Sequence, residues 1–174
     1  MNIYTLGAGL TVGSLGLYLY SVASNRYKHR DSLESARMPE DAMFIFQELS
    51  YREFPFLTLK ALEFGLFKTY AIPSISKVLI STNEMVGSTA RRYDDTDLIM
   101  REILENGVDT ERGDEALRRL NHLHSKHQIT NEDYIYVLCI FIVEPARWIN
   151  RYGYRTLHEK ETQVAKGRVL FQID

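Results

Sequence analysis

Apolar and polar positions follow a helical period through most of the chain. After residue 38, stretches rich in Leu, Ile and Phe alternate with short polar breaks. We find no stretch with the every-second-residue alternation of a half-buried strand. The pattern therefore predicts an all-α protein.

The first apolar stretch, residues 3–24, contains no charged residue. At a rise of about 1.5 Å per residue, a helix of this length reaches across a hydrocarbon core of roughly 30 Å. We therefore expect a transmembrane anchor at residues 1–24, a polar juxtamembrane linker at residues 25–38, and a helical domain at residues 39–174.

The charges that flank this stretch predict its direction across the bilayer. Arg26, Lys28 and Arg30 follow it, whereas no charged side chain precedes it. Because positive charge stays on the cytosolic side, we expect a single-pass protein with a lumenal N-terminus and a cytosolic domain. A cleaved signal peptide is the alternative, since residues 21–23 resemble a cleavage site, but its usual positive N-terminal charge is absent.

The domain is expected to consist of a series of helices separated by proline, glycine and polar breaks. Residues 106–107 are a typical helix end. Thr130 or Asn131 can cap the helix expected over residues 130–145. Residues 134–143 are apolar on all sides and too short to span a bilayer, which predicts a central buried helix. The expected helices cover residues 39–51, 56–70, 74–82, 92–105, 114–127, 130–145 and a last one from about 156.

Composition adds two constraints. The net charge is −2 and the isoelectric point is about 6.2, so no basic field is available to attract nucleic acid. Cys139 is the only cysteine and lies in the apolar run, so we expect a buried thiol and no internal disulfide.

Two helices carry polar residues on faces that are otherwise apolar. In the helix from Arg92, steps of 100° place Arg92 and Thr96 on the same side as Ile99, Met100 and Ile103. A buried guanidinium requires an anionic partner, because an unpaired buried charge is very costly. These two side chains are therefore candidate binding residues.

His124 lies on the apolar stripe of the next helix, whereas His122 falls on the opposite, solvated side. Two interpretations remain open for His124: a core histidine bonded to a backbone carbonyl, or an axial ligand to a metal or haem iron. No zinc motif, phosphate loop or nucleophile elbow accompanies it. Glu144, at the end of the buried helix, is expected to pair with Arg147 or Arg151, or alternatively with Arg92.

Three segments together resemble a known family. They are EFPFLTLKALEFGLFKTYAIPSISKVL, RRYDDT and ALRRLNHLHSKHQITNEDYIYVLCIFIVEPARWINRYGYRTL. In this order they are similar to the MpaB and rubber-oxygenase catalytic family, over roughly residues 39–161. The fungal branch of that family contains oxygenases bound to the endoplasmic reticulum membrane.

The resemblance implies a function and a site. Rubber-oxygenase relatives are all-helical proteins with haem b that use O2 to cleave isoprenoid double bonds. Their Arg-x-x-x-Thr element and proximal histidine match Arg92, Thr96 and His124. By this resemblance we expect a membrane-bound oxygenase of fungal secondary metabolism that cleaves a double bond in a hydrophobic, prenylated small molecule delivered by the lipid bilayer.

Two departures from the family pattern accompany this expectation. Asp95 stands where the rubber-oxygenase branch has a lysine that can ligate the haem, so that ligation is not expected. The family continues well past Arg155, whereas this chain ends at Asp174, so the C-terminal part of the domain is expected to be missing. The alternative function is a non-catalytic relative acting as a membrane-anchored helical protein.

Overall fold

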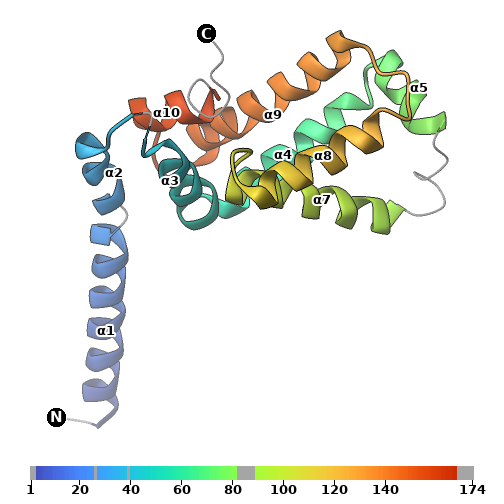
Figure 1. Cartoon of the computed structure of the whole chain (residues 1–174). Helices are drawn as coiled ribbons and strands as arrows, with labels where there is room; N and C mark the ends of the chain where they lie inside the picture. The colour runs from blue at the N-terminus through green and yellow to red at the C-terminus, as the bar shows by residue number, and fades with distance from the viewer. Residues whose placement is uncertain (1–2, 26, 39, 82–88, 168–174) are drawn as a thin grey trace. The chain divides into compact units, whose positions relative to one another are not determined.

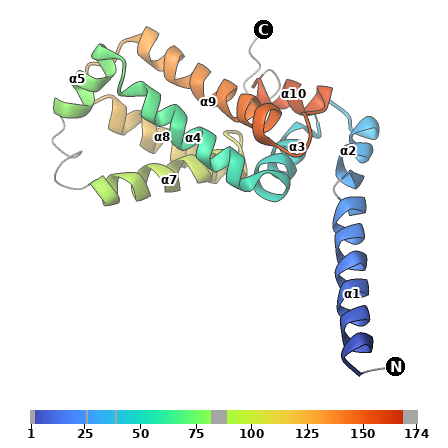
Figure 2. The same cartoon turned by 180° about the vertical axis from the view of Figure 1, so that it is seen from behind.

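The computed structural model describes the backbone of residues 3–25, 27–38, 40–81 and 89–167, and the side chains of these except 3–8, 10, 29, 32, 89 and 92. Within those ranges every regular element is a helix and no strand occurs. The all-α prediction is therefore confirmed. Figures 1 and 2 show the helices from two opposite sides.

The chain divides into two compact units, residues 1–37 and residues 38–174. The first unit contains α1 (Ile3–Asn25), α2 (Lys28–Ser32) and a short 3-10 turn, η1 (Leu33–Ser35). The segment expected to be a linker is therefore largely helical.

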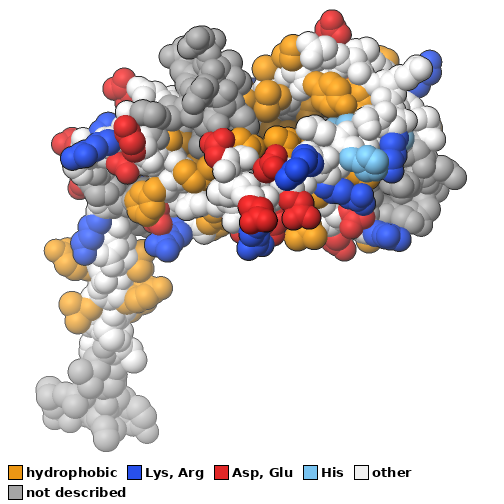
Figure 3. Space-filling model, viewed as in Figure 1, with side chains coloured by type: hydrophobic (Ala, Val, Ile, Leu, Met, Phe, Trp, Pro, Cys, Tyr) orange, Lys and Arg blue, Asp and Glu red, His pale blue; other side chains and the backbone are white. Residues whose placement is uncertain are grey.

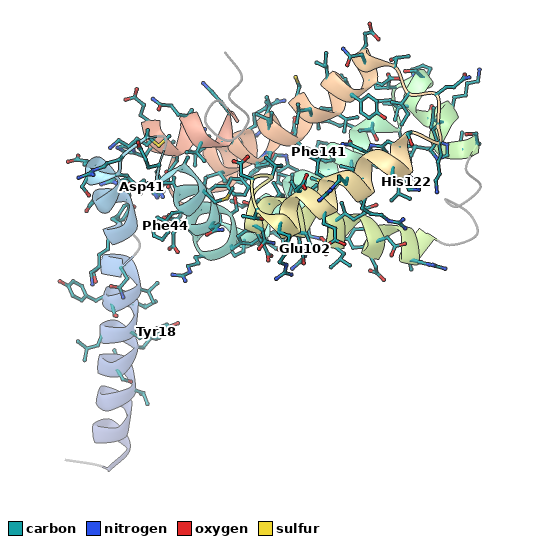
Figure 4. The ribbon with its side chains drawn as sticks, viewed as in Figure 1. Tyr18, Asp41, Phe44, Glu102, His122 and Phe141 are labelled. Atoms are coloured by element: carbon teal, nitrogen blue, oxygen red, sulfur yellow. The ribbon has the colours of Figure 1, made fainter. Side chains whose placement is uncertain are left out.

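The predicted span corresponds to α1, whose described apolar side chains are exposed, as at Val12, Leu17 and the Tyr18 labelled in Figure 4. The same helix also contains glycine and serine residues. Across the described part of the chain, no helix combines the length and the apolar character that crossing a membrane requires. The predicted single-pass topology is therefore not supported.

The second unit follows the predicted order of helices. Most ends lie within about three residues of the expected ones, but the helix expected to stop at Pro145 continues through that proline to Tyr152. The elements are α3 (Ala42–Gln47) with its π-helical continuation η2 (Glu48–Glu53), α4 (Pro55–Thr69), α5 (Pro73–Ser81), α7 (Thr89–Asn106), α8 (Glu111–His124), α9 (Asn131–Tyr152) and α10 (Glu159–Ala165).

Local capping signals explain several helix ends. The Thr130 side chain accepts a hydrogen bond from the backbone N–H of Asp133, and Thr110 does the same for Gly113 at the start of α8. Gly107 follows α7 with a φ of 77°, a left-handed conformation that favours glycine. The predicted cap at Thr130 and the predicted end at residues 106–107 are both confirmed.

The pairing of α4 with α9 forms the centre of the second unit, and the two helices lie side by side in both views (Figures 1 and 2). Gly65 permits their close approach, because a Cβ atom at that position would lie 2.8 Å from Ile140 Cγ2. Leu49, Phe54 and Ile149 form a buried apolar cluster at the end of this pair. Burial of such side chains is the main source of favourable free energy in a helical fold.

The prediction that α9 is buried on all sides is wrong. Ile135 and Val143 are 53% and 44% exposed, and Cys139, predicted to be a buried thiol, is exposed between them. These residues are spaced four apart and so share one side of the helix. Among the described elements, α9 packs mainly on α4 and α10, which leaves this side uncovered.

A buried arginine joins three segments that are distant in sequence. The Arg155 guanidinium donates to both carboxylate oxygens of Glu53, at 2.9 and 2.6 Å, and to both of Glu161, at 2.7 and 2.8 Å. A further bond reaches the carbonyl of Thr156, and the Phe54 ring lies 5.3 Å below the guanidinium carbon. Burial alone would lower the pKa of Arg155, but the hydrogen bonds to Glu161 and Glu53 outweigh it and raise that pKa.

A second ion cluster joins α4 to α9. The buried Glu144 carboxylate accepts from Lys68 Nζ at 2.6 Å and from Arg147 at 3.1 Å. The predicted partner Arg147 is therefore confirmed, Lys68 was not foreseen, and the alternative partner Arg92 has a side chain outside the described residues. Burial raises the pKa of Glu144, but the hydrogen bond and charge of Lys68 outweigh it, so that pKa lies below its ordinary value of 4.5.

Removal of Arg155 should destabilise the second unit strongly. We expect Arg155→Ala to lower the free energy of unfolding by about 3–5 kcal/mol, because it leaves two buried carboxylates without their cation. Arg155→Lys should also be destabilising, since an ammonium group has three donors where the guanidinium has five. Urea denaturation followed by circular dichroism measures both changes.

The matched control for this experiment is Arg118→Ala, which removes an exposed pair between Arg118 and Asp114 on α8. That change should cost no more than about 1 kcal/mol. Equal losses for the Arg118 and Arg155 variants would contradict a structural role for the buried network.

The Glu144 cluster predicts a pH dependence. Because the folded-state pKa of Glu144 is depressed, its ionised form contributes stability above about pH 4.5, and this contribution is lost as the pH falls through the folded-state pKa. The difference in unfolding free energy between wild type and Glu144→Gln should therefore shrink as urea titrations move from pH 7 to pH 3. A difference that stays constant with pH would contradict the assignment.

Candidate cofactor site

The helical hairpin of α7 and α8 brings the predicted site residues to one end of the second unit. The two helices run antiparallel and are joined by a short turn (Figures 1 and 2). Arg112 on α8 donates two hydrogen bonds to Glu102 on α7, at 3.0 and 2.6 Å. The last turn of α8, which carries His124, therefore lies beside the first turns of α7, which carry Arg92 and Thr96.

The apolar face predicted for α7 is buried along only part of the helix. Ile103 is 8% exposed and Met100 is half-buried, but Thr96, one turn earlier, is exposed. The side chain of Arg92 lies outside the described residues, although its backbone belongs to α7. The structure thus places Thr96 at the surface and not in a closed interior.

His124 is the last residue of α8 and is half-buried. Its ring packs against Tyr134 in the first turns of α9, with 5.5 Å between ring centroids. His122, labelled in Figure 4, is exposed, as its position on the opposite side of the helix predicted. The hairpin and α9 together hold the His124 imidazole in a defined place.

The surface around the hairpin is charged. Figure 3 shows acidic and basic side chains mixed along this face, which agrees with the exposed pairs that connect Arg101 to Asp97 and Arg118 to Asp114. Such mixed charge is typical of a solvated helix face. Because both signs of charge are mixed on this face, the described surface of the hairpin has no electrostatic field of one sign that would attract an ionic substrate.

The residues of this site fit the haem that the resemblance implies only in part. A neutral imidazole is suitable as an axial ligand, so the chemistry of His124 fits. The described residues contain no group of three or more His, Cys, Asp or Glu side chains suited to a metal ion. Thr96, being exposed, does not fit the wall of a haem pocket.

The sequence did not reveal several of the polar residues that the structure buries. Glu161 is fully buried, and Thr69 and Thr58, both on α4, are 2% and 8% exposed. Lys68 and Glu144 each interrupt a long apolar run, and a charge at such a position is a signal for a buried partner. No comparable local signal marks Arg155, whose carboxylate partner Glu53 lies 102 residues away.

Comparisons with known proteins give one consistent result. No family model and no solved structure matches the chain. The "ER-bound oxygenase mpaB" of Penicillium brevicompactum is 32% identical over 167 residues, which is 86% of this chain and 43% of that protein. The protein of the same name from Penicillium roqueforti is 33% identical over 86% of this chain and 56% of its own length.

The chain therefore spans about half the length of the curated relatives it matches, and the matched part extends over most of the chain. These matches confirm the resemblance to MpaB-type oxygenases that the sequence predicted.

Proposed function

We propose that this chain is an oxidoreductase of secondary metabolism that uses O2 to oxidise a small-molecule substrate. The observation that carries the proposal is the match, over about 86% of the chain, to proteins named as oxygenases. We further propose that the substrate is hydrophobic and prenylated and that a double bond of its prenyl chain is cleaved. The apolar side chains exposed along α9 support contact with a hydrophobic molecule.

The proposed cofactor is haem b, with His124 as its iron ligand. A bound haem would supply the binding and activation of O2. The chain itself would contribute the imidazole of His124, oriented by its packing on Tyr134. Arg92 and Thr96 are the proposed polar residues of the adjacent helix, with Thr96 acting from the protein surface and not from the wall of a closed pocket. The guanidinium and the hydroxyl are suited to hold an anionic or oxygen-bearing group by hydrogen bonds.

A second proposal concerns localisation. We propose that α1 attaches the chain to a lipid bilayer, in line with the words "ER-bound" in the names of the relatives. The exposed side chains of Val12, Leu15 and Leu19 share one side of the helix, whereas that of Leu17 lies on the opposite side, so packing of α1 on a single surface would not bury all four. Contact with lipid would remove them from water.

The haem proposal is tested by absorption spectroscopy of the full chain, purified in detergent after expression with added haem precursor. We expect a Soret band in wild type and in the matched control His122→Ala, and loss or a shift of the band in His124→Ala. O2 consumption with a prenylated phenol as substrate should likewise be present in wild type and His122→Ala and be lost or reduced in His124→Ala.

Two results would count against this proposal. A wild-type protein that is folded by circular dichroism but shows no Soret band and no O2 consumption would support the non-catalytic alternative, which the exposure of Thr96 favours. A band that survives His124→Ala unchanged would remove His124 as the ligand.

The membrane proposal is tested by flotation of the full chain with liposomes of phosphatidylcholine and phosphatidylserine. We expect wild type to float, and the double variant Leu15→Glu/Leu19→Glu to remain in the dense fraction, because charged side chains are costly to bury in lipid. Glu34→Gln, outside α1, is the control and should float. Equal flotation of wild type and the double variant would exclude α1 as the attachment.

A further inference from the structure

Five aromatic side chains form a continuous row across the α4–α9 pair, the two helices that lie side by side in Figure 2. In order along the row they are Tyr70, Phe67, Phe64, Trp148 and Tyr152, and the centroids of successive rings lie 6.4, 6.3, 5.6 and 5.5 Å apart. The row passes from one helix to the other between Phe64 and Trp148. These five residues are called the aromatic row below.

Most of the aromatic row is exposed to solvent. Phe67 is 67% exposed, Tyr152 57%, Phe64 40% and Tyr70 38%, whereas Trp148 is half-buried. Single exposed apolar residues are ordinary on a protein surface, but exposed rings that contact one another in a continuous patch mark a binding surface. The aromatic row therefore indicates a surface that binds a partner.

The kinds of ring narrow the class of partner. Phe64 and Phe67 lie inside the row, whereas Tyr70 and Tyr152, which carry a hydroxyl, lie at its two ends. Tyrosine and tryptophan are enriched where a membrane meets water, because the ring suits hydrocarbon and its polar edge suits the headgroups. Aromatic rings are also enriched at protein interfaces, so the ring types alone fit both kinds of partner.

Basic side chains lie over the rings. The Nζ atom of Lys68 is 5.0 Å from the centroid of the Phe64 ring, and the guanidinium carbon of Arg151 is 5.4 Å from that of Tyr152. Long basic side chains can rest their alkyl stems on an apolar surface while the charged end reaches polar headgroups. The row thus combines exposed rings with cations at their edges.

The acidic partner of these cations lies beneath them. Lys68 and Arg147 both pair with Glu144, whose side chain is 6% exposed, whereas that of Arg147 is 64% exposed. Lys60 and Glu63, on the same side of α4, pair with each other at 2.6 Å and so add no net charge. With the arginine over the last ring, three cations stand against one buried carboxylate, and the outer layer of this surface is positive.

This positive layer separates the two kinds of partner. A second copy of the chain would bring the same cations to the contact, and like charges placed together in an interface are costly. An anionic lipid surface, in contrast, attracts basic side chains and receives exposed aromatic rings at the same time.

We propose that the aromatic row binds the interface of a lipid bilayer that contains anionic lipid. The rings of Phe64 and Phe67 enter the boundary between headgroups and acyl chains, and Arg147 and Arg151 bind the anionic headgroups. The proposal rests on the attachment proposed for α1 and extends it, since the row is a second, weaker contact made by the second unit. Two linked contacts reinforce each other, because the first raises the effective concentration of the second.

Trp148 makes this contact measurable, because it is the only tryptophan of the chain and belongs to the row. The full chain is reconstituted into vesicles of phosphatidylcholine and phosphatidylserine whose acyl chains carry bromine, which quenches an indole lying against them. We expect wild type to lose Trp148 emission in these vesicles relative to unbrominated ones. Because α1 carries no tryptophan, attachment through α1 alone does not produce this loss.

Phe67→Glu should restore the emission, because a carboxylate is costly to bury in lipid. Phe67 is exposed, so circular dichroism should show an unchanged fold. Phe56→Glu is a second variant with the same expected result. Phe56 is equally exposed on the same side of α4, and an acid is favourable in the first turn of a helix.

Ile135→Glu is the matched control. Ile135 is 53% exposed but lies on a different side of α9 from Trp148. This variant introduces the same charge on the same helix and should stay quenched like wild type.

Arg151→Gln tests the role of charge. In vesicles that contain phosphatidylserine it should weaken the contact of the row about fivefold, the size expected for one basic side chain at an anionic surface, as measured by the fraction of Trp148 emission quenched. In pure phosphatidylcholine it should leave quenching unchanged. Equal effects in both kinds of vesicle would contradict binding to anionic lipid.

Three results would overturn the proposal. The first is a wild-type chain that floats with liposomes but keeps its full Trp148 emission in brominated vesicles. The second is quenching that survives both Phe67→Glu and Phe56→Glu. The third is an unquenched chain whose mass by light scattering is that of two copies and falls to one in Phe67→Glu, which would assign the row to a second copy.

Failure of this proposal is distinguishable from failure of the attachment by α1. Flotation of the Leu15→Glu/Leu19→Glu variant reports on α1, whereas quenching of Trp148 reports on the row. A chain that neither floats nor is quenched would overturn both.

Discussion

The interaction on which the second unit depends most is the burial of Arg155 between two carboxylates. A guanidinium has five N–H donors, and in this structure five hydrogen bonds leave Nε, Nη1 and Nη2 for Glu53, Glu161 and one carbonyl. Removing these charges from water is costly, and only near-complete pairing makes the arrangement favourable. The geometry that satisfies every donor therefore restricts where the end of η2, the end of α9 and the start of α10 can lie relative to one another.

The second carboxylate adds a negative charge that a single arginine does not neutralise. Neighbouring dipoles share it: the backbone N–H of His158 donates to Glu161, and the Tyr154 hydroxyl donates to Glu53. Burial and this bond to Glu53 raise the pKa of Tyr154 to about 12, so its hydroxyl stays protonated as a donor at neutral pH. The hydrogen bonds from His158 and Tyr154 therefore hold the network together as much as the ion pairs of Arg155 do.

Helix positions could be predicted from the sequence because their causes are local. The cap at Thr130 and the glycine after α7 act within one turn and are visible as short motifs. Burial is different, since it depends on which helix lies on which face. The apolar run of α9 predicted complete burial, but the described neighbours cover only part of its circumference and Cys139 lies on the uncovered side.

The candidate site shows the same difference between helix positions, which local sequence determines, and burial, which it does not. Helical phase correctly placed His122 on the outer side of α8, yet phase alone could not show that the face carrying Thr96 becomes exposed at that point. The partners of Arg155 and the unpaired hydroxyl of Thr58 depend on contacts between distant segments, so no local pattern reveals them. Sequence reasoning located helices and faces, and tertiary packing decided which of those faces meet solvent.

The exposed thiol on α9 has a practical consequence. Because Cys139 is the only cysteine of the chain and its side chain is accessible in the folded state, a maleimide reagent should modify a single known position without denaturation. Oxidation can join two chains through this residue, but it cannot join a third, so covalent assemblies end at the dimer. A spin label or fluorophore attached there would report on the side of α9 that also carries Ile135 and Val143.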